Sequence, residues 1–270
     1  MIGSVPEAVD LDHVAVAAWR LDDLWPRYAG DLGGATIGGG PSPGFDWAQV
    51  SFANGMKVEG LQPARVDEFD FLQRYLDRHG PGPHHMTFKV PDLSAVLAML
   101  DGSGIQPARV DRSDTRWQEA FLFPADACGI VVQLAQQSEG DGPEPLPADF
   151  PAPDAHARPG IEPASLDRVV LAVADLGVAV RLYKELLGGI EAGRGTDEDG
   201  SWVELAWPGP GRVRLVQTAD VPAGRTGYLH HLAFTVADPG RVADVVRSPA
   251  GSCEVRPERN FGVGLRLSPR

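Results

Sequence analysis

The chain has 270 residues, an apolar fraction of 43% and a formal net charge of −13. This is enough for one large or two ordinary domains with a hydrophobic core. The acidic balance argues against partners such as nucleic acid or an anionic membrane, and no apolar run approaches the roughly 20 residues that span a bilayer. Two cysteines in different halves and an N-terminus without signal character predict a cytoplasmic protein without a disulfide framework.

The sequence contains an internal repeat. Residues 11–34 align without gaps on residues 166–189, and nine of the 24 positions are identical, including the closing Gly-Gly. Residues 84–96 align on residues 230–242 and share two consecutive histidines. Self-similarity of this kind indicates duplication of a structural unit. We therefore expect two copies of one domain, each built from two smaller units.

In chain order, each unit opens with a short strand of alternating apolar residues, such as HVAVA (13–17) or HMTFKV (85–90). An amphipathic helix is predicted next in every unit, at residues 21–32, 92–103, 176–187 and 238–248. Asp92, Asp175 and Asp238 suit helix N-caps, and Gly33, Gly104 and Gly188 suit helix ends. Three further strands complete each unit. The predicted fold class is α+β, with four βαβββ units in two tandem domains.

Three segments are predicted from this organisation. Residues 1–137 form a first domain, which carries the candidate metal ligands, and residues 165–270 form a second, degenerate domain without metal. Residues 138–164 are rich in proline and acidic residues and have no periodicity, which is typical of an extended linker. The second domain is neutral, with 13 basic and 13 acidic residues, so the acidic excess lies in the first domain and the linker.

Four potential metal ligands follow the repeat. Glu59 comes 46 residues after His13, and Gln133 comes 48 residues after His85. Each is predicted to lie on a short strand, and related units that pack edge to edge bring the four side chains to one concave face. Two imidazoles, one carboxylate and one amide oxygen leave open positions on a divalent ion, as catalysis requires.

Other polar residues share the predicted face of the sheet. Strand alternation puts Lys57 with Glu59, and puts Thr87 and Lys89 with His85. Lys57 and Lys89 are candidate substrate-binding residues for an anionic group, although surface lysines with solvated ammonium groups explain them equally simply. Glu119 is either a base near the site or a strand carboxylate in a salt bridge.

The second copy departs from the ligand pattern. Arg168, Arg214 and Arg266 occupy the positions of His13, Glu59 and Gln133, and His231 alone keeps its residue type. Guanidinium groups do not ligate cations, so this copy is predicted to hold no metal. Its arginines either pair with acids such as Glu204 or form an anion pocket.

The pattern resembles the vicinal oxygen chelate superfamily, which includes glyoxalases, bleomycin-resistance proteins and extradiol dioxygenases. The segments that carry the resemblance are LDHVAVA (11–17), HHMTF (84–88) with its PDL turn, and FLFPADACGIVVQL (121–134). The first half is most similar to methylmalonyl-CoA epimerase and related glyoxalase-like proteins. The resemblance implies metal ligands at His13, Glu59, His85 and Gln133. The chain departs from it at Gln133, where the family usually has glutamate, so the identity of the proton-transferring base is open.

The function expected from the residues and the resemblance is a metal-dependent isomerase, epimerase or lyase. It would act on a small carbonyl or acyl substrate through a metal-stabilised enolate, with Glu59 as the leading catalytic residue. One divalent metal ion is the expected cofactor, and zinc, manganese, cobalt, nickel and iron are not distinguished. The alternatives are an extradiol-type Fe(II) dioxygenase and a metal-free binding or resistance protein. A homodimer is left open.

Overall fold

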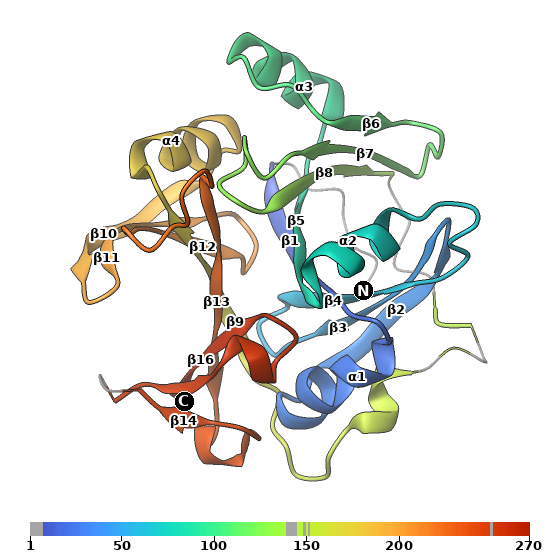
Figure 1. Cartoon of the computed structure of the whole chain (residues 1–270), viewed down its shortest axis with the longest axis vertical. Helices are drawn as coiled ribbons and strands as arrows, with labels where there is room; N and C mark the ends of the chain where they lie inside the picture. Colours follow the sequence, from blue (N-terminus) through green and yellow to red (C-terminus); the bar gives the residue numbers. More distant parts are fainter. Residues whose placement is uncertain (1–7, 139–144, 148–149, 151, 249–250) are drawn as a thin grey trace. The chain divides into compact units, whose positions relative to one another are not determined.

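The computed structural model describes residues 8–138, 145–147, 150, 152–248 and 251–270, and these residues form two eight-stranded sheets (Figure 1). The first sheet has the order β2-β3-β4-β1-β5-β8-β7-β6. Its strands are β1 (Asp10–Ala17), β2 (Ala35–Ser42), β3 (Phe45–Ser51), β4 (Lys57–Pro63), β5 (Gly82–Lys89), β6 (Arg109–Asp111), β7 (Trp117–Leu122) and β8 (Val131–Gln137).

The second sheet has the corresponding order β10-β11-β12-β9-β13-β16-β15-β14. Its strands are β9 (Ser165–Val173), β10 (Ile190–Asp197), β11 (Gly200–Ala206), β12 (Arg212–Gln217), β13 (Gly227–Val236), β14 (Val246–Arg247), β15 (Cys253–Val255) and β16 (Gly264–Pro269). The matching order confirms the predicted α+β class with two tandem domains. The exact boundaries of the two domains stay a prediction.

The helices are short. The α-helices are α1 (Leu21–Trp25), α2 (Phe71–His79), α3 (Leu93–Gly102) and α4 (Leu176–Val180). π-Helical turns extend the first and last of these, at η1 (Pro26–Asp31) and η3 (Arg181–Leu186), so the two copies share this irregularity. The 3₁₀ turns are η2 (Pro153–His156), η4 (Pro239–Arg241) and η5 (Pro257–Arg259). None of the helices in the described ranges has the length and apolar character needed to cross a membrane.

The predicted helix caps are confirmed. The carboxylates of Asp92 and Asp175 accept hydrogen bonds of 3.0 Å from the amides of Ala95 and Val178. Asp238 accepts one of 2.8 Å from the amide of Gly240. These contacts satisfy amide groups that have no partner within the first turn of a helix.

Two sequence predictions about helices were wrong. The fourth helix, expected over residues 238–248, is only the turn η4, because Pro239 and Gly240 at its start disfavour continuation of an α-helix. The segment that joins the first two units contains an unpredicted helix, α2, which begins after Asp70. The helix predicted over residues 21–32 is present, but only its first part is α-helical, since a π-helical turn begins at Pro26.

The described residues divide into two compact units, and each unit draws on both halves of the sequence. The first contains residues 8–13, 85–138 and 168–230. The second contains residues 14–84, the described part of 145–167, 231–248 and 251–270. Each unit therefore joins parts of the two tandem copies.

In the second unit, helix α2 closes one face of the sheet. Ala15 and Ala17 of β1, Leu61 of β4, and Leu72 and Leu76 of α2 form a buried apolar cluster. Burial of this cluster fixes the helix on the sheet through the hydrophobic effect. By strand alternation, Ala15 and Ala17 lie on the face predicted for the ligands.

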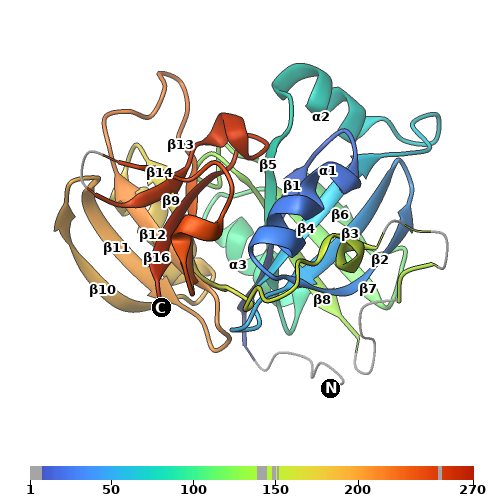
Figure 2. The same cartoon turned by 90° about the horizontal axis from the view of Figure 1, so that it is seen from below.

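The described part of the predicted linker packs against the second unit rather than extending freely. Turn η2 lies beside α1 in both views (Figures 1 and 2). Asp154 accepts a hydrogen bond of 2.9 Å from the amide of Thr36, and Ala164 donates one of 2.9 Å to the carbonyl of Leu32. Residues 139–144, 148–149 and 151 of the predicted linker lie outside the described residues.

In the first unit, the turn between β7 and β8 packs directly against the start of β13. A side chain added at Gly129 would overlap with the carbonyl group of Gly227. The hydroxyl of Tyr183 donates a 3.1 Å hydrogen bond to the carbonyl of Ala127, and Thr226 donates one of 2.9 Å to that of Pro124. The contact thus joins segments about 100 residues apart in the sequence.

We expect Gly129→Ala to lower the free energy of unfolding by about 2–5 kcal/mol, because a positive φ and steric overlap both oppose the new side chain. The φ angle at Gly129 is +90°. The matched control is Gly104→Ala, which has φ +82° but no atom within 4 Å of the added carbon, and should cost about 1 kcal/mol. Urea unfolding followed by circular dichroism measures both. Equal losses in the two variants would contradict the close contact.

Candidate metal centre

The four predicted ligands lie on consecutive strands of the first sheet. Glu59 is on β4, His13 on β1, His85 on β5 and Gln133 on β8, and the sheet order includes β4-β1-β5-β8. All four side chains belong to buried residues, with exposed fractions of 2–8%. Buried polar side chains in the middle of a sheet need a structural or chemical reason, because burial without partners is costly.

Three of the ligands converge. His13, Glu59 and His85 each have one ligand atom within 4.8 Å of the others. The rings of His13 and His85 meet edge to face, with centroids 5.7 Å apart. Two imidazoles and one carboxylate at this spacing can bind a divalent ion.

The hydroxyl of Thr87 connects His13 to the fourth predicted ligand. Its Oγ1 lies 2.9 Å from Nε2 of His13 and 2.5 Å from Oε1 of Gln133. Nε2 of Gln133 donates a 2.6 Å hydrogen bond to Glu119, which also accepts one of 2.9 Å from Nε1 of Trp117. Glu119 therefore turns the Gln133 amide so that its oxygen faces the histidine.

Glu119 is a buried acid beside this centre. Burial raises the pKa of its carboxyl, and the hydrogen bonds from Trp117 and Gln133 oppose that shift. Among the described residues, its partners are the neutral side chains of Trp117 and Gln133 rather than a cation. The sequence predicted either a base near the site or a strand carboxylate in a salt bridge. The contacts of Glu119 agree with a position near the site.

The donor set fits a cation. Nδ1 of His13 lies 2.8 Å from a carboxylate oxygen of Asp12, so a neutral ring carries its proton on Nδ1 and presents Nε2 as an acceptor. Oε1 of Gln133 is a second acceptor, but the hydroxyl of Thr87 has one proton and can donate to only one of the two. A divalent ion binds nitrogen and oxygen lone pairs together and removes this conflict.

The carboxylate of Glu59 is oriented by its neighbour on β3. Nε2 of Gln49 donates a 3.0 Å hydrogen bond to Oε1 of Glu59, and the two residues are directly opposite in the antiparallel pairing of β3 and β4. Gln49 is itself 8% exposed. The hydrogen bond holds one carboxylate oxygen and so orients the carboxylate as a whole.

The two candidate lysines differ in their surroundings. The ammonium of Lys89 lies 3.1 Å from Oδ1 of Asp12 and 5.9 Å from the centre of the Trp117 ring. Lys57 is half-buried and lies two residues before Glu59 on β4. Their assignment to substrate binding stays a prediction.

Sequence reasoning missed three residues of this region, namely Asp12, Gln49 and Thr87, as contributors to the site. Thr87 lies two residues after His85 and therefore on the same strand face, which could have indicated its place in the site. Asp12 recurs as Asp167 in the second copy. No comparable sequence signal pointed to Gln49.

In the second copy, two substituted arginines converge on one carboxylate. Nη1 of Arg168 and Nε of Arg214 donate hydrogen bonds of 2.9 and 3.0 Å to Oε2 of Glu204. Nε of Arg266 lies 3.4 Å from Glu254. The prediction that these arginines pair with acids such as Glu204 is confirmed for Arg168 and Arg214.

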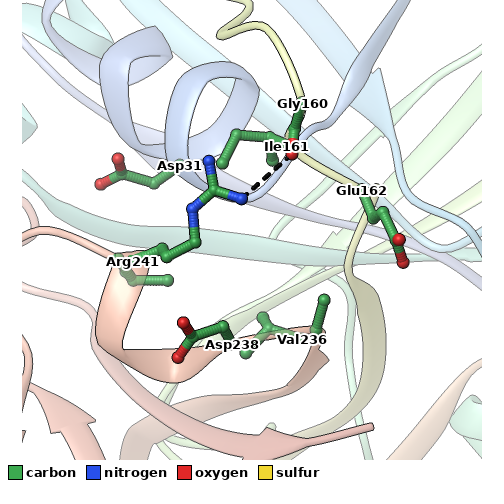
Figure 3. Close-up of a pocket in the computed structure, with 9 residues that line it drawn as sticks. Asp31, Gly160, Ile161, Glu162, Val236, Asp238 and Arg241 are labelled. Carbon is green, nitrogen blue, oxygen red and sulfur yellow. Dashed lines mark hydrogen bonds between the residues drawn. The ribbon is translucent and has the colours of Figure 1, made fainter.

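A separate surface pocket lies in the second unit and contains none of the candidate ligands. Arg241 lies between Asp31 and Asp238 in this pocket and donates a 3.1 Å hydrogen bond to the carbonyl of Gly160 (Figure 3). Asp31 is already paired with Arg27, at 2.5 Å. These contacts are internal to the protein and point to a structural role for the pocket's charged groups.

Comparison with known proteins agrees with the repeat and identifies the family. The model of the glyoxalase-like domain family matches residues 11–187. The chain belongs to this family. The model of the glyoxalase, bleomycin-resistance protein and dioxygenase superfamily matches residues 165–266. The protein is thus a member of the vicinal oxygen chelate superfamily, as the sequence resemblance predicted. No curated protein matches the chain.

Two solved structures that match nearly the whole chain share the fold of this glyoxalase-like protein. A variant of 4-hydroxymandelate synthase from Streptomyces coelicolor is 14% identical, with a TM-score of 0.64 over 99% of this chain and 92% of its own. A xylose isomerase-like TIM barrel/4-hydroxyphenylpyruvate dioxygenase fusion protein is 16% identical, with a TM-score of 0.60 over 98% of this chain and 50% of its own. Methylmalonyl-CoA epimerase from Mycobacterium tuberculosis is 24% identical, with a TM-score of 0.43 over 51% of this chain and 93% of its own.

We expect Glu204→Gln to lower the free energy of unfolding by about 1–2 kcal/mol, because two guanidinium groups lose the charge that they share. The loss is smaller than for a fully buried pair, since the side chains of Arg168 and Arg214 are 31% and 22% exposed. Glu162→Gln, which removes an exposed pair with Arg270, is the control and should change little. A Glu204→Gln protein as stable as wild type would show that the shared carboxylate does not stabilise the fold.

Proposed function

We propose that this glyoxalase-like protein is a divalent-metal-dependent isomerase, epimerase or lyase. It would remove a proton next to the carbonyl group of a small carbonyl or acyl substrate. The observation that carries the proposal is the convergence of His13, Glu59 and His85 within 4.8 Å in a chain of this family. Buried side chains that converge and can bind a metal are typical of a functional centre.

His13, His85 and Glu59 would hold the ion, with the amide oxygen of Gln133 as the fourth protein ligand. When bound, the cation would stabilise negative charge that develops on a substrate oxygen. The two histidines and the amide are neutral ligands. Glu59 therefore supplies the single negative charge of the proposed ligand set. The buried surroundings exclude water and strengthen electrostatic interactions at the centre.

Proton transfer is assigned to Glu59 first. A neutral amide does not accept a proton at neutral pH, so Gln133 is unsuited to this role. Gln49 holds one oxygen of Glu59, which fixes the direction of the other. Glu119 is the second candidate, because it is the next acid along the hydrogen-bonded chain through Gln133.

Lys57 and Lys89 are proposed to contact an anionic group of the substrate. Both lie on strands that carry a ligand, and both alternate onto the ligand face. An ammonium group near a developing anion is favourable in a site that excludes water.

The main alternative is an extradiol-type Fe(II) dioxygenase, which two histidines and one carboxylate also suit. Anaerobic iron loading followed by measurement of oxygen uptake with catechols distinguishes it from the proposed function. A metal-free binding protein is the third reading. It would retain no stoichiometric metal after purification and loading.

We expect one divalent ion per chain, lost in His13→Ala and in His85→Ala, because each removes a ligand from a set of three or four. The protein is loaded with Co²⁺ or Zn²⁺, dialysed and analysed for metal. The matched control is His231→Ala, which removes the counterpart of His85 in the second copy, is also buried and should leave one ion bound. Undiminished metal in either ligand variant, or two ions in wild type, would contradict the assignment.

We expect Glu59→Gln to lower turnover by about 10²-fold or more at saturating metal, because it removes the proposed base. Gln133→Glu should retain the metal and bind it more tightly, since it adds a negative charge beside the cation. Solvent-deuterium exchange into a panel of acyl-CoA and α-hydroxycarbonyl compounds measures the proton step. If Glu59→Gln exchanges as fast as wild type while Glu119→Gln does not, the base is Glu119.

A further inference from the structure

The carboxylate of Asp12 lies between a proposed metal ligand and a lysine. Its Oδ2 is 2.8 Å from Nδ1 of His13, and its Oδ1 is 3.1 Å from the ammonium of Lys89. The Asp12 side chain is 10% exposed, and that of His13 is 3% exposed. Both oxygens of one nearly buried carboxylate are therefore committed to defined partners.

Strand geometry alone does not produce this contact. Asp12 and His13 are consecutive residues of β1, and consecutive side chains of a strand leave the backbone toward opposite faces. The carboxylate has to turn along the strand to reach the imidazole. The pairing with Lys89, which comes from β5, holds it in that direction.

The contact decides which nitrogen of His13 is available. A hydrogen bond from Nδ1–H to a carboxylate fixes the tautomer, and it leaves Nε2 as the ligand atom. Nε2 is the remaining ring nitrogen, and it lies 2.9 Å from the hydroxyl of Thr87. A carboxylate behind a ligating imidazole also makes the imidazole a stronger donor to a cation.

The second copy provides an internal comparison. Asp167 corresponds to Asp12, Thr235 to Lys89 and Arg168 to His13. There the aspartate accepts a 2.5 Å hydrogen bond from the Thr235 hydroxyl, while Arg168 binds Glu204 instead. The aspartate is thus retained in both copies, but only the copy with a histidine beside it forms the lysine–carboxylate–imidazole chain.

We propose that Asp12 is a positioning residue for the metal ligand His13, and that Lys89 holds Asp12 in place for this role. The inference rests on the proposed function of His13 as a ligand. In this role Asp12 would contact neither the ion nor the substrate. It acts by fixing the ring orientation and the protonated nitrogen of His13. Asp12 thus supports the proposed metal site without being one of its ligands.

The first test does not need metal. In ¹⁵N-labelled protein, two-bond ¹⁵N–¹H correlation spectra at a pH where the ring is neutral identify the protonated nitrogen of His13. Wild type should show the proton on Nδ1, and Asp12→Ala should shift His13 toward the Nε2–H tautomer. Asp12→Asn keeps an oxygen acceptor and should preserve the wild-type tautomer. An identical His13 spectrum in wild type and Asp12→Ala would overturn the proposal.

The second test measures affinity for Co²⁺ by its visible absorption, in competition with a chelator. Asp12→Ala should bind Co²⁺ about 10–100-fold more weakly than wild type, as is typical for loss of a partner of a metal ligand, and Asp12→Asn should lose less. Asp167→Ala, the counterpart in the second copy, should bind as wild type does. Circular dichroism and thermal unfolding check that all variants are folded.

The outcomes separate this inference from the proposed function. If wild type binds no Co²⁺, the proposed function fails, and the tautomer measurement still decides whether Asp12 positions His13. If wild type binds Co²⁺ and Asp12→Ala binds it equally well, the positioning role is wrong while the metal site stands. Equal weakening by Asp12→Ala and Asp167→Ala would indicate a general effect on the fold and would also overturn the inference.

Discussion

The buried hydroxyl of Thr87 is the contact on which the candidate metal centre depends. Thr87 has no exposed surface, and its hydroxyl reaches His13 on one side and Gln133 on the other. Strands β5 and β8 pair in parallel with Thr87 opposite Gln133, which places the two side chains on the same face. A register shift of one residue would turn Gln133 to the other face, so the backbone pairing determines the ligand set.

The two copies show what the scaffold fixes and what it leaves free. The strand order, the π-helical turns and the aspartate caps recur in both copies. Three of the four candidate ligand types do not recur, because His13, Glu59 and Gln133 are replaced by Arg168, Arg214 and Arg266. The arginines supply their own positive charge, which Glu204 balances. A scaffold whose core is independent of these side chains can therefore hold either kind of charge arrangement.

The repeat made the fold predictable, and the spacing pointed to three side chains, His13, Glu59 and His85, that lie together in the structure. Hydrophobic alternation is a local signal, so the strands that carry His13 and His85 could be read directly. Helix α2 was missed because no element was predicted for the segment between the first two repeat units. The predicted fourth helix does not form, because Pro239 and Gly240 outweigh the apolar pattern after them. Asp12, Gln49 and Thr87 could not be assigned roles, since their contacts depend on side-chain directions that alternation does not specify.

The charge of the ligand set limits the chemistry that the centre can support. Glu59 is the single carboxylate among the four proposed ligands, and the nearby Asp12 is balanced by Lys89. A divalent ion held by this set would keep a net charge of about +1, since imidazole and amide ligands are neutral. A second acidic ligand in place of Gln133 would cancel that charge. The amide at this position therefore favours a substrate that develops one negative charge on an oxygen at the ion, which is the charge produced when a proton is removed next to a carbonyl group.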